Sequence, residues 1–125
     1  MIVGLGLDLT EISRIASLLE RWGDRFANRI FTEGERAFAY ARAEPARHLA
    51  ARFAVKEAAL KALAVPSGLS WHEMEVTGGG SRPPALVLSG RARQAADKLG
   101  VSRLLVTISH DGDTAAAVVV AEGTP

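Results

Sequence analysis

The sequence predicts a single α+β domain in which an antiparallel sheet packs against a long central helix and shorter helices. Three observations predict this class: an alternating segment near the amino terminus, an alanine-rich helical segment in the middle, and two alternating segments joined by a turn at the end. A chain of 125 residues is long enough to bury one core but too short for two.

The first strand is expected over Val3 to Thr10, where two kinds of residue alternate strictly. Valine and leucine take one face, whereas Gly4, Gly6, Asp8 and Thr10 take the other. The glycines leave the second face nearly bare. They could leave space near Asp8, or they could only let a helix pack closely against the strand.

A helix is expected next, with Thr10 as its N-cap and its end near Trp22. Ile12, Ile15 and Leu19 recur, together with that tryptophan, at the spacing of a stripe that faces a core. We therefore expect these four apolar side chains to be buried.

The other side of this helix carries arginines. Arg14 and Arg21 are seven residues apart, and Arg25 would join them within an arc of about 40° if the helix continued past Gly23. Arginine forms paired hydrogen bonds with carboxylates, so the pattern suits an acidic partner helix. A solvated basic face would show the same pattern.

Two shorter elements are expected before the central helix. A helical turn is expected within Asp24 to Phe31, and a helix that reaches about Arg42 follows it. Thr32 and Glu35 have the spacing of a capping box, in which each side chain accepts a hydrogen bond from the backbone of the other. Capping accounts for Glu35 without a catalytic role.

The central helix begins near Pro45 and carries charges on a face that is otherwise small. At 100° per residue, Glu57 and Lys61 share a stripe with Ala50 and Ala54. A carboxylate one turn before an ammonium group could bind a metal beside a phosphate. The same spacing is also that of an ordinary surface ion pair.

The remaining segments predict further strands, turns and one helix. These are a turn at Pro66 to Gly68, a strand over Trp71 to Thr77, a flexible loop over Gly78 to Pro84, a strand over Ala85 to Leu88, a helix over Gly90 to Leu99 capped by Ser89, and a hairpin of Leu104 to Ser109 with Thr114 to Ala121.

The turn of the final hairpin carries patterns with several interpretations. Ser109, His110 and Asp111 are the residue types of a hydrolase triad, but immediate neighbours diverge and cannot form a relay. His110 could donate a hydrogen bond to a phosphate or simply be exposed. Asp111 and Asp113 could hold a cation, although aspartates in such turns usually serve the backbone.

The composition excludes several classes of protein. The absence of cysteine rules out a disulfide scaffold, a thiol nucleophile and a zinc ribbon. A net charge of +1 is too small to indicate bulk binding to nucleic acid or membranes. The chain starts without a basic leader or a long apolar run, which favours a cytoplasmic protein.

Several motifs gain meaning when they are taken as an ordered set. They are Gly4-Leu5-Gly6-Leu7-Asp8-Leu9, Glu11-Ile12 with Arg14-Ile15, Phe31-Thr32-Glu33-Gly34-Glu35, Arg52-Phe53-Ala54-Val55-Lys56-Glu57-Ala58 with Lys61-Ala62, and Ile108-Ser109-His110. This set resembles the holo-[acyl-carrier-protein] synthase family, the small phosphopantetheinyl transferases, in order and over nearly the whole chain. The resemblance implies the 4'-phosphopantetheinyl transferase fold and a role in fatty acid biosynthesis.

The resemblance also implies a reaction: a magnesium-dependent transfer of 4'-phosphopantetheine from coenzyme A to a serine of apo acyl carrier protein, with release of adenosine 3',5'-bisphosphate. By this resemblance Asp8 and Glu57 bind the metal, which prefers hard oxygen ligands. Lys61 would balance the phosphates. We further expect Glu57 to take the proton of the serine hydroxyl, directly or through a water.

Other residues acquire binding roles by the same resemblance. The coenzyme-binding positions would be Arg52, Lys61, Arg82, Pro83, Ser109 and His110, and the carrier-docking positions would be Arg14, Arg21 and Arg25. Arg52 lies about 140° around the helix from Glu57, so one helix cannot direct both at one ligand. The family's homotrimers, with sites between subunits, would let Arg52 serve a neighbour.

The sequence departs from the family pattern in two loops. Ala64 to Gly68 replaces a turn that usually begins on glycine, and Ser81 stands where glycine often precedes the basic residue. The sequence therefore does not predict the coenzyme contacts of these two loops. Two other functions fit the same residues: a noncatalytic oligomeric module that binds nucleotides or acidic helices, and a phosphohydrolase that needs no carrier.

Overall fold

A computed structural model describes residues 1–65 and 68–125. Most of the predicted turn at Pro66 to Gly68 lies outside these residues. The elements are β1 (Ile2–Glu11), α1 (Ile12–Trp22), α2 (Asp24–Ile30), α3 (Glu33–Tyr40), α4 (Pro45–Ala62), the short 3₁₀ helix η1 (Trp71–Glu73), β2 (Met74–Gly79), β3 (Arg82–Leu88), α5 (Gly90–Lys98), β4 (Val101–Asp111) and β5 (Thr114–Gly123).

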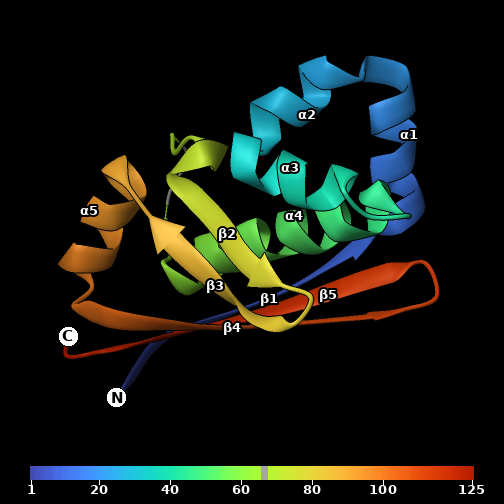
Figure 1. The fold of residues 1–125 in the computed structure, drawn as a ribbon. Helices are drawn as coiled ribbons and strands as arrows, with labels where there is room; N and C mark the ends of the chain where they lie inside the picture. The colour runs from blue at the N-terminus through green and yellow to red at the C-terminus, as the bar shows by residue number, and fades with distance from the viewer. Residues whose placement is uncertain (66–67) are drawn as a thin grey trace.

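α4 packs against strands of both antiparallel sheets and against α1 and α3 (Figure 1). The larger sheet has the strand order β1-β5-β4, and β2 pairs with β3 in a two-stranded sheet. α4 lies across one face of the larger sheet. α1 and α3 pack on the side of α4 that faces away from this sheet. The predicted α+β class, with antiparallel strands against a long central helix, is therefore confirmed.

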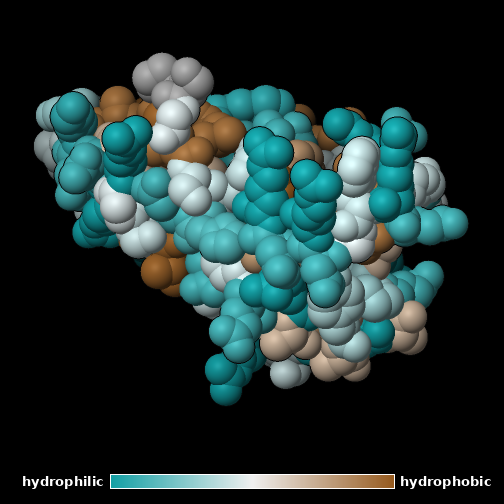
Figure 2. Space-filling model, turned by 90° about the horizontal axis from the view of Figure 1, so that it is seen from above, coloured by the Kyte–Doolittle hydropathy of each residue, from teal (hydrophilic) through white to brown (hydrophobic). Residues whose placement is uncertain are grey.

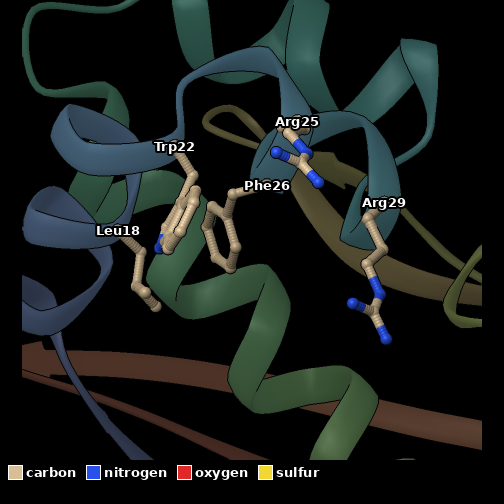
Figure 3. Close-up of a pocket in the computed structure, with 5 residues that line it drawn as sticks. All are labelled: Leu18, Trp22, Arg25, Phe26 and Arg29. Atoms are coloured by element: carbon tan, nitrogen blue, oxygen red, sulfur yellow. The ribbon is translucent and has the colours of Figure 1, made fainter.

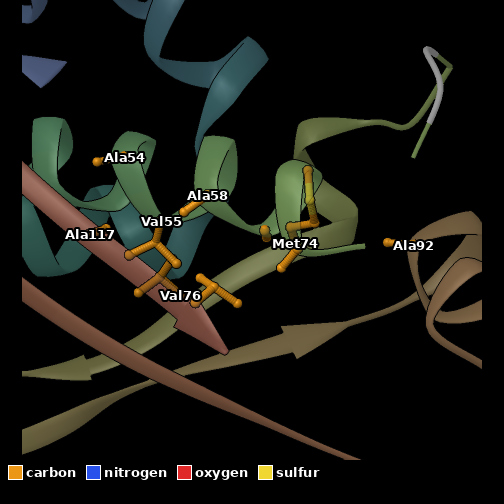
Figure 4. Packing of buried hydrophobic residues seen from close by; sticks show 10 residues of the cluster. Ala54, Val55, Ala58, Met74, Val76, Ala92 and Ala117 are labelled. Carbon is orange, nitrogen blue, oxygen red and sulfur yellow. The ribbon is translucent and has the colours of Figure 1, made fainter. Parts of the chain in front are cut away.

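Residues on nearly every side of α4 are buried, and Figure 4 shows one cluster to which this helix contributes. Because the sheet covers one side of this helix and other elements cover the rest, its buried residues are not confined to one or two stripes. The main cluster joins α4 to β2, α5 and β5, and includes Ala54, Val55, Ala58, Met74, Val76, Ala92 and Ala117.

β1 lies directly on α4 because its inward face carries glycines. A Cβ added to Gly6 would lie 1.8 Å from the carbonyl oxygen of Ala58, and one added to Gly4 would lie 1.9 Å from that of Ala62. Close helix packing therefore explains both glycines. It also holds the inward-facing Asp8, two residues after Gly6, beside the same helix.

The Gly6→Ala substitution should lower the free energy of unfolding by about 1 to 3 kcal/mol, because the strand and the helix would have to separate. Denaturant titration of the purified variant measures this change. Gly34→Ala is the control, since the nearest atom to its added Cβ is the end of the Glu75 side chain at 3.1 Å. Equal stability of the Gly6 variant and the wild type would contradict the packing described here.

The start of α1 differs from the prediction. Thr10 is not its N-cap, because the pairing of β1 with β5 continues to Glu11 and keeps Thr10 in the strand. Asp113 serves instead: its carbonyl oxygen accepts from the Ile12 N–H at 2.8 Å, and its side chain accepts from the Ser13 N–H at 2.9 Å. This aspartate of the final hairpin therefore serves the backbone.

Three other boundaries also differ. The predicted strand over Trp71 to Thr77 begins with η1, and β2 and β3 extend into the predicted flexible loop. Ser89 makes no side-chain cap for α5. The carboxylate of Glu73 accepts from the Ala92 N–H at 3.1 Å instead. By contrast, the capping box of Thr32 and Glu35 is confirmed at the start of α3.

Candidate active site

β1 and α4 bring three of the predicted catalytic side chains together. The Nζ of Lys61 lies 3.4 Å from Oδ1 of Asp8 and donates to the carbonyl oxygen of Leu7 at 2.7 Å. Glu57 stands one turn earlier on α4. Burial raises the pKa of Glu57, the charge of Asp8 raises it further, and Lys61 and Arg14 oppose the shift. The two carboxylates therefore repel each other, and the positive charges of Lys61 and Arg14 partly offset this repulsion.

This arrangement fits a divalent cation. Two carboxylates that disfavour each other's charge gain from a cation between them, and magnesium prefers such hard oxygen ligands. The Thr10 hydroxyl donates to Oδ2 of Asp8 at 3.2 Å and so orients that carboxylate. Within residues 1–65 and 68–125, no group of three or more histidine, cysteine, aspartate or glutamate side chains is placed to hold a metal.

A second group of predicted residues lines a hollow of about 360 Å³ elsewhere on α4. Arg52, Arg82 and His110 come from α4, β3 and β4, and Arg47 and His48 line the same hollow. This hollow is rich in cationic groups. A separation of five residues places Arg52 and Glu57 about 140° apart on the helix, so the hollow and the carboxylates face different sides.

Arg52 is the most deeply held side chain of this hollow, with 3% of its surface exposed. Its Nη2 donates to the carbonyl oxygen of Gly78 at 2.8 Å, and its guanidinium lies 3.8 Å from the ring centroid of Phe38. Its Nε is buried without a hydrogen-bond partner among the described residues. Burial lowers the pKa of Arg52, but the guanidinium remains charged. An anion in the hollow would offset this cost.

Ser109 and Pro83 are not brought into this hollow. Both are exposed, and neither is among the residues that line it in the described part of the chain. Pro84 lines it instead. Their roles in binding a coenzyme stay predictions.

The predicted arginine face is divided by Gly23. Arg14 and Arg21 lie exposed on α1, but this glycine has a φ of 53° and ends the helix, so Arg25 belongs to α2. The condition for placing Arg25 on the same helical face, a helix that continues past Gly23, is therefore not met. The glycine stops the helix because its left-handed backbone breaks the α-helical geometry.

Trp22, the last residue of α1, lies at the surface beside both helices. It is 46% exposed and so does not face the core as predicted. The guanidinium carbons of Arg21 and Arg25 lie 5.0 and 5.9 Å from the centroid of its ring. Figure 3 shows this ring beside Phe26, in a pocket that Leu18, Arg25 and Arg29 complete. The result is an exposed aromatic site among cations.

Sequence reasoning missed a buried ion pair beside the candidate site. Nζ of Lys56 lies 2.8 Å from Oε1 of Glu35, and both side chains are fully buried. The same Nζ donates to the carbonyl oxygens of Trp71 and Met74, and Oε2 of Glu35 accepts from the Val76 N–H. Burial lowers the pKa of Lys56, and the charge of Glu35 opposes that shift. The pair ties α3, α4 and β2 together.

The outer face of the larger sheet is exposed along β1, and its β1 side is apolar. The helical side of the molecule, seen in Figure 2, carries mostly hydrophilic side chains. On the sheet, by contrast, Leu5, Leu7 and Leu9 are more than half exposed. The strand register places Leu7 of β1 opposite Val118 of β5. Leu5 of β1 and Leu105 of β4 are both paired with Val120 of β5, one on each side of it. A contiguous apolar face of this kind marks an interaction surface.

No helix in residues 1–65 or 68–125 has the length and apolar content needed to cross a membrane.

Comparison with known proteins identifies the class that this fold and site define. The model of the 4'-phosphopantetheinyl transferase superfamily matches residues 4–119. The chain therefore belongs to this superfamily.

Within this superfamily, the chain is similar to holo-[acyl-carrier-protein] synthases. A holo-[acyl-carrier-protein] synthase of Anaeromyxobacter dehalogenans is 48% identical over 127 residues, 99% of this chain and 98% of the relative. The crystal structure of the Neisseria meningitidis synthase superimposes with a TM-score of 0.86 at 31% identity over 98% of this chain and 99% of that one. The Helicobacter pylori synthase, solved in complex with coenzyme A, gives 0.81 at 30% identity over 94% and 99%. The predicted family and enzyme class are confirmed.

Proposed function

We propose that this chain is a single phosphopantetheinyl transferase domain that moves 4'-phosphopantetheine from coenzyme A to a serine of apo acyl carrier protein. Adenosine 3',5'-bisphosphate is the second product. The observation that carries the proposal is the meeting of Asp8, Glu57 and Lys61 where β1 crosses α4. The relatives named holo-[acyl-carrier-protein] synthase support the carrier as acceptor. A cytoplasmic role in fatty acid biosynthesis follows from the same proposal.

Asp8 and Glu57 would hold a magnesium ion together with the pyrophosphate of coenzyme A. When bound, the ion withdraws charge from the phosphorus under attack and from the departing bisphosphate. Lys61, anchored by the Leu7 carbonyl oxygen, contributes a positive charge beside the same phosphates. Glu57 takes the proton of the serine hydroxyl.

The exposed arginines of α1 and α2 would bind the carrier protein. Arg14 and Arg21 offer guanidinium groups to an acidic helix, and Arg25 adds a third from the start of α2. The exposed ring of Trp22, beside Arg21 and Arg25, supplies an apolar contact within this charged surface.

The two groups of candidate residues support a site shared between subunits. The carboxylates and the cationic hollow face different sides of α4, so a neighbouring copy would supply the hollow for each coenzyme. The apolar outer face of the larger sheet supplies a surface for this assembly, which we propose is a homotrimer. In it, Arg52, Arg82 and His110 of a neighbour would bind the adenosine and its 3'-phosphate.

Replacing Leu7 by glutamate should disperse this assembly, because the charge would be buried in an apolar interface. Light scattering coupled to size exclusion should show a fall in molar mass from trimer to monomer, with loss of transfer activity. Val87→Glu is the matched control, since Val87 is similarly exposed on β3 of the other sheet. An unchanged trimer in the Leu7 variant would refute the proposed interface.

The transfer itself is tested by incubating the protein with coenzyme A, magnesium and an apo carrier protein. Mass spectrometry should find phosphopantetheine on the carrier serine, and EDTA should prevent its formation. Release of phosphate from coenzyme A without a carrier would favour a phosphohydrolase. Binding of coenzyme A with no adduct and no hydrolysis would favour the noncatalytic module.

A further inference from the structure

The wall of the cationic hollow contains a histidine that the proposed reaction does not use. His48 lies one turn before Arg52 on α4, so both side chains reach the same hollow. Its ring meets Phe38 edge-on, with 5.7 Å between ring centroids and an interplanar angle of 79°. Phe38 in turn stacks against the guanidinium groups of Arg42 and Arg52. The imidazole is therefore held within a cluster of cations.

Charged or titratable groups from the neighbouring elements lie near this imidazole or line the same hollow. They are Arg47 and Arg52 on α4, Arg42 after α3, Glu44 before α4, Arg82 on β3 and His110 on β4. Burial lowers the pKa of His48, the positive charges of Arg47, Arg42 and Arg52 lower it further, and Glu44 alone opposes them. The free hollow therefore holds a neutral His48 near pH 7.

A phosphate dianion in the hollow would reverse this balance. Its charge offsets the repulsion from the arginines and favours the imidazolium, which can also donate a hydrogen bond to phosphate. We propose that His48 is a specificity-determining residue for coenzyme A, taking up a proton when the 3'-phosphate enters the hollow. This inference rests on the proposed function, in which the hollow binds that phosphate.

The sign of the pH dependence follows by linkage. At low pH His48 is protonated with or without the ligand, and at high pH it is neutral in both states. Between these limits, and above about pH 6 where the free phosphate is mostly a dianion, binding takes up a proton, so affinity for coenzyme A rises as the pH falls, by at most about tenfold per pH unit. Dephospho-coenzyme A lacks the 3'-phosphate and should show no such gain. The preference for coenzyme A therefore grows as the pH falls toward about 6.

Calorimetry of the wild type and His48→Phe, in buffers that differ in ionisation enthalpy, tests this proposal. Phenylalanine keeps an aromatic ring against Phe38 but cannot titrate. We expect the wild type to take up more protons per coenzyme A bound than the variant, by up to about one. The phosphate ionises near pH 6 on its own, so measurements near pH 7, where it is mostly a dianion before binding, keep its own contribution small in both proteins. Equal proton uptake by the two proteins would overturn the inference.

A second measurement does not depend on the variant. Nuclear magnetic resonance can follow the titration of His48 in the wild type, since the chain has 3 histidines. The His48 signals should titrate at higher pH with coenzyme A than without it, and unchanged titration would overturn the inference. Failure of the wild type to prefer coenzyme A over its dephospho form at any pH would instead refute the hollow as the phosphate site.

Discussion

Replacing Glu57 by glutamine should lower kcat for phosphopantetheine transfer by about 10²- to 10⁴-fold. The amide cannot accept the proton of the serine hydroxyl, and it removes one of the two carboxylate charges proposed to hold magnesium. Stability should not suffer, because the charge of Asp8 and burial already disfavour the ionised form of Glu57 in the folded protein. Steady-state kinetics at saturating magnesium measure the effect.

Glu33→Gln is the matched control for this experiment, because Glu33 is an exposed glutamate on α3, away from the carboxylate pair. Its kcat should equal that of the wild type. If the Glu57 variant kept near-normal turnover at saturating magnesium, Glu57 could not be the base.

Replacing Lys56 by methionine should lower the free energy of unfolding by about 3 to 5 kcal/mol. The substitution leaves Glu35 charged and fully buried, and it removes the donor of the Trp71 and Met74 carbonyl oxygens. Denaturant titration measures the loss. Lys98→Met, an exposed lysine near the end of α5, should change stability by no more than about 0.5 kcal/mol.

The double variant Glu35→Gln/Lys56→Met separates the ion pair from general packing. Its destabilisation should be clearly smaller than the sum of the two single effects, because neither partner then leaves a buried charge unpaired. Additive losses would show that the two side chains act independently.

Local signals predicted most of the fold. These signals depend only on neighbouring residues: the alternation in β1, Pro45 at the start of α4, and the capping box of Thr32. Each of the three elements formed where it was expected. The errors involve distant partners. Asp113 caps α1 from 100 residues away, and Glu73 takes the role expected of Ser89. No local pattern could reveal these contacts.

In the candidate site, too, local motifs were predictive and contacts between distant residues were not. Asp8, Glu57 and Lys61 were selected by motif, and the structure brings them close together. The Lys56 and Glu35 pair was missed because helical periodicity gives no sign that α4 is buried on nearly every side. The outward orientation of the β1 leucines was also unforeseen. Alternation defines two faces of a strand, but only the glycine contacts with α4 reveal which face lies inside.

The most direct test of the account measures whether Asp8 and Glu57 hold a divalent ion against coenzyme A. Manganese can replace magnesium as an oxygen-binding divalent ion, and its free concentration can be followed by electron paramagnetic resonance. The wild type with coenzyme A should bind about one manganese ion per subunit, and Asp8→Asn and Glu57→Gln should each bind it at least about tenfold more weakly. Unchanged manganese affinity in both variants would contradict the account.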